Sequence, residues 1–371
     1  MTVIKGGPKK IRVGIIGANP NRGWAAQAHI PALRSLSDDF EITALSTTSR
    51  ASAEAAGNFF GVPNAFDNHQ DLVNSIDVDV VVITVKVPHH LELATAALNA
   101  GKAAYCEWPL GNGLKEAETL AALAKEKGVL AVVGLQARSA PSVSYVRDLI
   151  RQGYVGEVLS TTLIGSGMGW GPTEDPFNEY MNDNTNGATM LSIPLGHAAE
   201  ALCYGLGEIR ELSATMTTRR KTYTIAGTGE TKQRNAADQV AVTGLLEGGA
   251  VFSIHYRGGV SRGTNLLWEI NGAEGDLQLS ASGGHTQIWE MTIRGGKGAQ
   301  SSLEVLPVPE EYRWATLQGP GTNVAQAYAH FGRDYREGTH SCPTFDDAVT
   351  RHRMLNAIET AASTGQRQTL D

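Results

Sequence analysis

The chain has 371 residues, of which 42% are hydrophobic and 19% charged, a composition typical of a globular protein with about two domains. Its net charge of −7 argues against a broad nucleic-acid-binding surface, because phosphate binding needs clustered Lys and Arg side chains. No apolar run approaches the length of a membrane span, and residues 1–10 lack the apolar core of a signal peptide. We therefore expect a soluble, cytoplasmic protein with no nucleic-acid or membrane partner.

The cysteine and histidine pattern gives no indication of a disulfide framework or a metal site. Cys106, Cys203 and Cys342 are far apart and odd in number, which fits a reducing compartment. Their spacing is not that of metal ligands, and the adjacent His89 and His90 would point apart on most backbones. We expect no bound metal.

The segment 11–36 reads as a strand, a glycine turn and a helix. An apolar run at 11–16 is followed by a turn-rich segment from Gly17 to Gly23 and then by a helical pattern. This is the first half of a dinucleotide-binding unit, in which glycine lets the backbone approach a pyrophosphate that faces the helix N-terminus. Asn19 replaces the second glycine of the strict pattern, but Asn tolerates left-handed backbone angles. The motif alone leaves an ordinary strand–turn–helix without a ligand open.

Strands and helices alternate through the rest of the first half, which predicts a parallel, doubly wound Rossmann sheet over residues 1–137. The expected strands lie at 40–46, 78–85, 103–107 and 130–135, and the expected helices at 50–60, 71–76, 90–100 and 114–127.

The pattern of residues 138–371 predicts an α+β domain with a large, mostly antiparallel open sheet, because many strands are joined by hairpin-length turns. The expected strands lie at 158–164, 211–218, 239–246, 250–256, 266–271, 276–279, 287–294 and 303–305, and the expected helices at 142–151, 190–204, 323–337 and 344–364. We expect one face of this sheet, carrying Leu267, Trp268, Ile270 and Ile288, to be covered in a homo-oligomer, a dimer or tetramer.

Motifs along nearly the whole chain resemble the Gfo/Idh/MocA (glucose-fructose oxidoreductase / inositol dehydrogenase) family. They are VGIIG at 13–17, AAQAHIPAL at 25–33, HLELATAALNAGK at 90–102, CEWPL at 106–110, GLQAR at 134–138 and INGAEGDL at 270–277. The segments TVKVPHHLE at 84–92 and LGHAAEAL at 195–202 resemble the branch that contains a galactose-regulon repressor. The resemblance implies NAD or NADP in the Rossmann domain and hydride transfer to or from a sugar or cyclic polyol. A non-catalytic dinucleotide sensor is the alternative, as in the repressor branch.

The family's Glu-Lys-Pro motif reads Glu-Trp-Pro at 107–109, so the catalytic lysine of the family is absent. Trp108 cannot move protons at neutral pH, and we interpret it as a wall against a sugar ring or nicotinamide, with simple packing as the alternative. Lys86, at the carboxyl end of a buried strand, could supply the missing positive charge, although lysines are usually solvated. We expect Pro109 to end a tight turn, for which a cis peptide bond is one option.

The family's second motif is matched only at its histidine, His197, because Ile193 and Leu195 replace its Asp and Gly. The resemblance implies that His197 takes the hydroxyl proton while hydride leaves the carbon. A core histidine is the alternative. Glu200 matches the charge of an acidic residue that the family places after this histidine, and Tyr180 is another candidate for proton transfer.

Other residues are expected to bind the cofactor because they match family positions or follow Rossmann strands. No acid lies between Ser46 and Arg50, and hydroxyls with an arginine suit a 2′-phosphate, so we favour NADP with NAD possible. An ordinary strand-end turn explains the same hydroxyls, and a locally paired carboxylate is the alternative for Glu107. The expected cofactor contacts are Gly17, Asn19, Arg22, Gly23, Trp24, Ser46, Thr47, Thr48, Arg50, Thr84, Val85, Pro88, His90, Glu107, Trp108 and Gln136.

The segment 165–183 is a long loop rich in glycine, proline and aromatic residues, and loops of this length are often functional. Its aromatic side chains could stack on a polyol, and a packed loop without a ligand is the alternative. Arg138 follows the last Rossmann strand and could line the site or form a structural ion pair. The expected substrate contacts are Trp108, Arg138, Trp170, Tyr180, Asn184 and His197.

Overall fold

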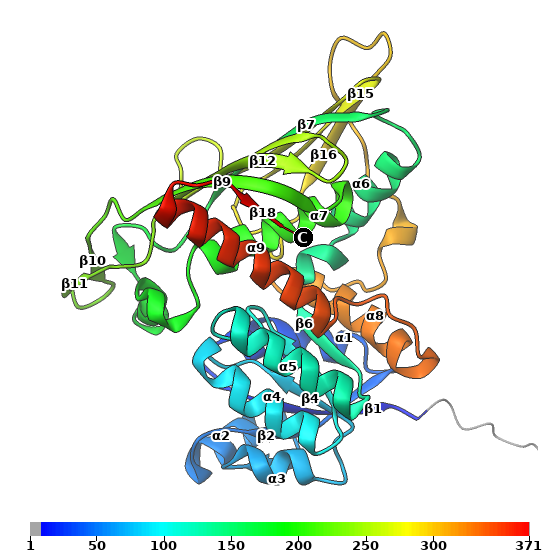
Figure 1. Ribbon diagram of the computed structural model, residues 1–371. Helices are drawn as coiled ribbons and strands as arrows, with labels where there is room; N and C mark the ends of the chain where they lie inside the picture. Colours follow the sequence, from blue (N-terminus) through cyan, green and yellow to red (C-terminus); the bar gives the residue numbers. More distant parts are fainter. Residues whose placement is uncertain (1–8, 371) are drawn as a thin grey trace, which may run out of the picture. The chain divides into compact units, whose positions relative to one another are not determined.

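The computed structural model describes residues 9–370, which form two compact units (Figure 1). The first unit comprises residues 9–111, Lys115–Gly134 and Trp314–Ala348; the second comprises Asn112–Leu114, Leu135–Arg313 and residues 349–370. The return of Trp314–Ala348 to the first unit was not indicated by the sequence pattern. Residues 1–8, on which the expectation about a signal peptide depends, lie outside the described part. Within that part, no helix is long and apolar enough to span a bilayer.

The first unit is built on a six-stranded parallel sheet with the order β3-β2-β1-β4-β5-β6. Its strands are β1 (Ile11–Ile16), β2 (Phe40–Ser46), β3 (Asn64–Phe66), β4 (Val80–Ile83), β5 (Ala103–Glu107) and β6 (Ala131–Gly134). Its helices are a π-helical turn (Ala25–His29) that continues as α1 (Ile30–Ser35), then α2 (Arg50–Phe60), α3 (His69–Asn74), α4 (His90–Asn99), α5 (Leu114–Lys127) and α8 (Thr322–Glu337). The predicted parallel Rossmann sheet is confirmed.

Strand β1 is covered on both faces, as a doubly wound sheet requires. Val13 and Ile15 are fully buried in one apolar cluster with Tyr328 of α8. Gly14 points to the other face, where an added Cβ would lie 2.9 Å from Leu72 of α3. Glycine at this position therefore lets α3 approach the strand closely.

Helix α3 begins two residues earlier than the predicted helix at 71–76. The side chain of Asn68 caps it by accepting a hydrogen bond of 2.9 Å from the backbone N–H of Asp71. The preceding strand β3 was not predicted, because three residues are too few to show an alternating pattern.

The second unit is built on a nine-stranded sheet with the order β17-β16-β15-β14-β7-β13-β12-β9-β18. Only β7 and β13 pair in parallel within it, so the predicted mostly antiparallel sheet is confirmed. The strands are β7 (Val158–Ser166), β9 (Ile209–Thr217), β12 (Gln239–Leu246), β13 (Val251–Arg257), β14 (Leu266–Gly272), β15 (Gly275–Ala281), β16 (Thr292–Lys297), β17 (Glu304–Val305) and β18 (Gln368–Thr369). The helices are α6 (Pro141–Arg151), α7 (Gly196–Leu206) and α9 (Phe345–Thr364).

A separate three-stranded sheet contains β8 (Thr173–Glu174), β10 (Thr222–Ile225) and β11 (Thr231–Gln233). These strands and β18 have two to four residues each and were not predicted. The strand predicted at 287–294 is wrong in its first part, which is a turn, since β16 begins only at Thr292.

The register of β14 corrects the expectation that four apolar side chains share an exposed face. Neighbouring residues of a strand point to opposite faces, and Trp268 and Ile270 lie fully buried on the covered one. The indole N–H of Trp268 donates to Thr161 Oγ1 at 2.9 Å. Of the four residues, Leu267 lies on the open side of β14. Ile288 lies in a turn outside the sheet.

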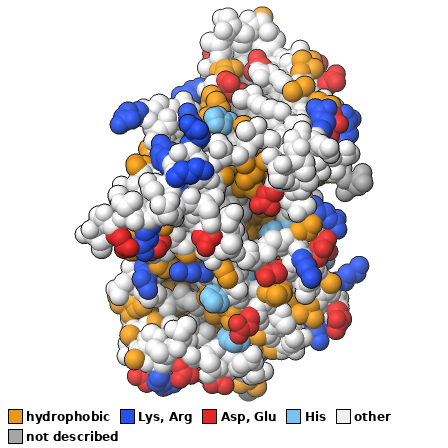
Figure 2. Space-filling view, turned by 60° about the vertical axis from the view of Figure 1, so that its left-hand side comes forward, with side chains coloured by type: hydrophobic (Ala, Val, Ile, Leu, Met, Phe, Trp, Pro, Cys, Tyr) orange, Lys and Arg blue, Asp and Glu red, His pale blue; other side chains and the backbone are white. Residues whose placement is uncertain are grey.

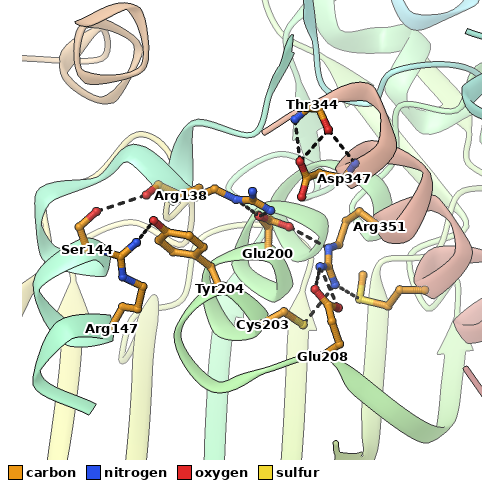
Figure 3. Close-up of polar contacts among 11 residues, drawn as sticks. Arg138, Ser144, Arg147, Glu200, Cys203, Tyr204, Glu208, Thr344, Asp347 and Arg351 are labelled. Carbon is orange, nitrogen blue, oxygen red and sulfur yellow. Dashed lines mark hydrogen bonds and ion pairs between the residues drawn. The ribbon is translucent and has the colours of Figure 1, made fainter. Parts of the chain in front are cut away.

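A buried ion cluster centred on Glu200 joins three segments of the second unit (Figure 3). Arg138, after β6, places Nε 2.6 Å and Nη2 2.5 Å from Glu200 Oε1. Arg351 of α9 donates from Nε to Glu200 Oε2 at 2.9 Å and from Nη2 to Glu208 at 2.8 Å. Glu200 and Arg351 have side chains that are 0% and 1% exposed. Both carboxylate oxygens of Glu200 are thus compensated, as a buried charge requires.

We predict that Arg351→Met lowers the free energy of unfolding by about 3–5 kcal/mol, because it leaves buried carboxylate charge uncompensated. A matched control is Arg367→Met, which removes a guanidinium that is 55% exposed and 3.2 Å from Glu211. Its cost should stay below about 1 kcal/mol, as for other surface pairs. Urea unfolding of both variants measures the difference. Equal losses in the two variants would mean that the buried cluster does not stabilise the second unit.

Candidate functional site

The turn after β1 has a geometry that only glycine can adopt at Gly17. Its φ is +101°, and its N–H donates to Ser46 O at 3.0 Å, at the end of β2. A Cβ at Gly17 would lie 2.8 Å from Val85 Cγ1 and 3.1 Å from Thr84 O, after β4. The turn therefore brings three predicted cofactor-binding segments together at the carboxyl edge of the sheet, where doubly wound folds bind ligands.

Asn19 supports this turn in a way that differs from the sequence expectation. Among the described non-glycine residues only Met168 and Trp170 have a positive φ, so Asn19 does not use the left-handed conformation that Asn tolerates. Its Oδ1 instead accepts a hydrogen bond of 2.9 Å from the N–H of Asn21, and its backbone pairs with Arg22. The Asn19 side chain thereby stabilises the turn at the position where the strict pattern has its second glycine.

The helix that follows this turn starts two residues after a second glycine with a positive φ. Gly23 has a φ of +90°, and the helical turn Ala25–His29 begins after Trp24. Within residues 9–370, no side chain caps this N-terminus. The N–H of Gln27 donates to Gly23 O at 3.2 Å, whereas the helix dipole at this uncapped end favours negative charge.

The loop after β4 carries the predicted residues from Thr84 to His90. Thr84 Oγ1 donates to Ile16 O at 2.9 Å, and Lys86 and Pro88 are exposed. The ring of His90 is 1% exposed, with Nδ1 2.8 Å from Pro109 O and Nε2 3.1 Å from Val85 O. Burial lowers its pKa. This placement indicates that His90 holds two loops together rather than reaching a cofactor itself.

The Glu-Trp-Pro segment after β5 is largely buried. The Glu107 carboxylate lies 3.0 Å from His29 Nε2, and His29 Nδ1 lies 2.7 Å from the hydroxyl of Tyr328. Local pairing, the alternative considered for Glu107, is what the structure shows. Trp108 is 5% exposed, and the peptide bond between it and Pro109 is cis, as considered from the sequence.

The end of β2 presents hydroxyls and one arginine. Ser46 is buried, Thr47 Oγ1 lies 2.6 Å from Ser52 Oγ, and Thr48 is exposed. Arg50, at the start of α2, is 65% exposed and places Nε 2.7 Å from Glu54 Oε1. Both partners of this pair are exposed, so it is a weak one.

In the second unit, His197 lies near the start of α7 and is 3% exposed. Its Nδ1 is buried and has no hydrogen-bond partner among the described residues. Burial, with a smaller contribution from nearby His285, lowers the pKa of His197 to about 3. The imidazole is therefore neutral at physiological pH, and one of its ring nitrogens can accept a hydrogen bond.

The sequence analysis missed His285. Its Nε2–H donates to Gly167 O at 2.7 Å, and its Nδ1 lies 3.2 Å from Gln287 Nε2. The only signal in the sequence is a histidine after a Gly-Gly turn, in a segment that was interpreted as the approach to a strand. The pairing with Gly167, 118 residues away, comes only from the tertiary structure.

The predicted substrate residues of the 165–183 loop and beyond lie in different surroundings. Trp170 is 1% exposed, and its indole N–H donates to Met181 O at 2.9 Å, which is unfavourable for stacking on a ligand. Tyr180 is half-buried, and burial raises its pKa. Asn184 is exposed, with its backbone N–H donating to Asn235 Oδ1.

The remaining candidates follow β6. Gln136 is 1% exposed in a short 3₁₀-helix, and Arg138 forms the ion pair with Glu200, so the structural alternative for Arg138 is the one the structure shows. In the described part of the chain, no group of three His, Cys, Asp or Glu side chains is arranged to hold a metal ion.

Two family matches cover most of the chain. Residues 11–135 match the oxidoreductase family with an NAD-binding Rossmann fold (Gfo/Idh/MocA), and residues 141–281 match the C-terminal domain of Gal80p.

Curated relatives of both kinds are similar to this chain. Dehydrogenase aclE of Aspergillus oryzae is 30% identical over 96% of this chain and 98% of its own length. The galactose/lactose metabolism regulatory protein GAL80 of Saccharomyces cerevisiae is 29% identical over 76% of this chain and 69% of its own length.

Solved structures share the fold. A super-repressor mutant of Gal80p from Saccharomyces cerevisiae has a TM-score of 0.88 at 24% identity and covers 97% of this chain and 98% of its own. Levoglucosan dehydrogenase in complex with NADH and L-sorbose has a TM-score of 0.85 at 21% identity, with 98% and 100% covered. From these matches and the glycine turn, the chain belongs to the Gfo/Idh/MocA oxidoreductase family, with an NAD-binding Rossmann fold.

Proposed function

We propose that the protein is an NAD(P)-dependent oxidoreductase that transfers a hydride between nicotinamide and a CH–OH group of a sugar or cyclic polyol. The observation that carries this proposal is His197, a buried neutral imidazole whose Nδ1 has no partner in the described part of the chain. Such a group can accept the hydroxyl proton. The relative named as a dehydrogenase supports the reaction type, and the complex of levoglucosan dehydrogenase with L-sorbose supports the substrate class.

Each unit contributes a separate part of the proposed reaction. A bound nicotinamide would supply the hydride acceptor. The Gly17 turn and the uncapped N–H groups after Trp24 would hold the pyrophosphate. His197 would take the hydroxyl proton, and Lys86 and Tyr180 are the other candidates for proton transfer.

A non-catalytic dinucleotide sensor is the second candidate function, and a specific observation favours it. Trp108 stands where the family has its catalytic lysine, and its indole N–H cannot act as an acid or base near neutral pH. The relatives named as galactose/lactose regulatory proteins support the same alternative. A screen for cofactor reduction over sugars and inositols separates the two, because a sensor would bind the dinucleotide without turnover.

We also propose a small-molecule partner and a cytoplasmic location. Figure 2 shows acidic and basic side chains interspersed over the face that it draws, with no single continuous basic surface there. Cys106, Cys203 and Cys342 are buried and form no disulfide in the described part of the chain, which supports a reducing compartment.

We predict that NADP binds at least as tightly as NAD. Arg50→Ala should weaken NADP binding about tenfold, the value of one charge-assisted hydrogen bond, and leave NAD within about twofold. Arg333→Ala is the matched control, because Arg333 also pairs with a Glu four residues later on an exposed helix face. Calorimetric titration of the wild type and the two variants with NADP and NAD measures the six dissociation constants. A tenfold preference of the wild type for NAD would contradict the prediction.

We predict that His197→Ala lowers kcat by about 10²–10⁴-fold, the usual contribution of a general acid–base group. The dissociation constant of the cofactor should stay within a few-fold, since the Gly17 turn is unchanged. His255→Ala on β13, an exposed histidine, is the control.

Because burial holds the pKa of His197 at about 3, its protonation should produce no acid limb in kcat/KM between about pH 5 and 8. A loss of activity smaller than tenfold in His197→Ala would shift the proton-transfer role to Lys86 or Tyr180. Steady-state kinetics of Lys86→Ala and Tyr180→Phe distinguishes those two.

The open face of the nine-stranded sheet supports a homo-oligomer. Ser213, Thr243, Ser253 and Thr162 lie directly opposite one another across four strands on this face, and Ser253 Oγ donates to Thr162 Oγ1 at 3.2 Å. Because these hydroxyl side chains are short, they project little from this face of the sheet. A second copy could therefore pack against it closely.

We predict a dimer or tetramer at micromolar concentration, measured by light scattering. Thr243→Arg, which places a long charged side chain in the middle of the open face, should dissociate it. Thr119→Arg on the exposed side of α5 is the control and should leave the mass unchanged. A monomeric wild type would refute the proposed assembly.

A further inference from the structure

Two segments far apart in the sequence, 166–171 and 283–289, lie against each other in the second unit. His285 Nε2–H donates to Gly167 O at 2.7 Å, and Tyr256 donates from its hydroxyl to Gly284 O at 2.8 Å. A Cβ on Gly284 would overlap the backbone of Ser166. The two segments are therefore packed as closely as their backbones allow.

The contact exposes one sulfur and one indole side by side. Met168 is 37% exposed and has a φ of +60°, a conformation that L side chains rarely adopt. The indole N–H of Trp289, a half-buried residue, donates to Met168 Sδ at 3.3 Å. A Cβ on Gly283 would overlap the Trp289 ring, so glycine there makes room for the indole. Trp170, the aromatic residue expected to face a ligand, is instead buried.

The same segments adjoin the element that carries the proposed base. A Cβ on Gly167 would lie 3.2 Å from Met190 Cγ, and Met190 immediately precedes the helical turn Leu191–Leu195 that leads to His197. His285 is close enough to His197 to affect its protonation electrostatically. A ligand whose hydroxyl reaches His197 thus has these loops as its surroundings within this unit.

We propose that Met168 and Trp289 form the apolar platform on which the C–H face of the sugar or polyol packs, and that His285 is the positioning residue that holds it. This inference rests on the substrate class of the proposed function. An indole and a polarizable thioether offer large contact area to aliphatic C–H groups and compete with none of the ligand hydroxyls. Strained non-glycine backbone of the kind found at Met168 persists only where surrounding contacts enforce it, and His285 supplies one of them through Gly167.

The first experiment follows the indole N–H resonance of Trp289 by NMR in the full chain saturated with NADP. Levoglucosan, D-galactose and myo-inositol are added in turn, and Trp289→Phe assigns the signal. At least one of the three should shift it. No shift with a sugar that binds or is oxidised would overturn the platform.

The second experiment measures KM and kcat, or the sugar dissociation constant if there is no turnover, in two variants. Met168→Ala and Trp289→Phe should each raise KM or the dissociation constant several-fold to about tenfold, with kcat and cofactor affinity little changed. Val305→Ala on β17, an exposed apolar residue of the same unit, is the control and should change nothing. Unchanged sugar affinity in both variants would overturn the proposal.

The role of His285 is tested by two replacements. His285→Gln keeps an N–H that can donate to Gly167 O and should retain most of the sugar affinity, whereas His285→Phe should lose it as the platform variants do. Equal behaviour of the two would overturn the positioning role, and the Trp289 resonance reports whether the platform itself remains.

The outcomes also separate this inference from the proposed function. Turnover with an unresponsive Trp289 overturns the platform and leaves the enzyme. Sugar binding at Trp289 without turnover supports the platform and favours the sensor. Failure of every sugar to bind or react overturns both.

Discussion

A fully buried carboxylate is the constraint on which the second unit depends. Glu200 has no access to solvent, so its charge must be compensated by protein groups. Arg138 and Arg351 approach it from two sides, and they belong to segments that are more than 200 residues apart in the chain (Figure 3). Moving any of the three would leave an unpaired charge in the interior. The position of α7 is fixed by this requirement.

The consequence for chemistry is that His197 lies on a fixed helix. Glu200 is three positions after His197, so the two side chains are neighbours on the same side of α7. The Glu200 site satisfies every charge that it buries, whereas Nδ1 of His197 has no partner in the described part of the chain. A structural network and an unsatisfied polar atom thus occur on one short helix, and the second is the kind of exception that points to function.

In the first unit, too, some polar groups are paired within the protein and others are exposed. Glu107 and His90 carry family motifs, yet their side chains contact His29 and two backbone carbonyls, and hold the loops after β4 and β5 in place. The groups left available are the backbone N–H groups after Trp24 and the exposed hydroxyls and arginine at the start of α2. A dinucleotide site can therefore be present whether or not chemistry follows. The indole of Trp108 has no acid–base group near neutral pH, so this segment of the first unit does not distinguish the enzyme from the sensor.

Local pattern determined much of this protein. The strands at 40–46, 103–107 and 239–246 and the helices at 50–60 and 114–127 have the predicted bounds, because their periodicity and turn residues are strong. The Rossmann class and the mostly antiparallel second sheet were also readable from the sequence.

The tertiary structure decided which side chains are covered. Trp170 is buried and Met168 exposed, Trp268 lies on the covered face of β14, and Arg138 pairs with Glu200, although the sequence allowed the opposite in each case. His285 has no motif, and its partner Gly167 is 118 residues away. Burial and pairing of this kind arise from contacts between distant segments. The hydrophobic periodicity of a single segment does not predict such contacts.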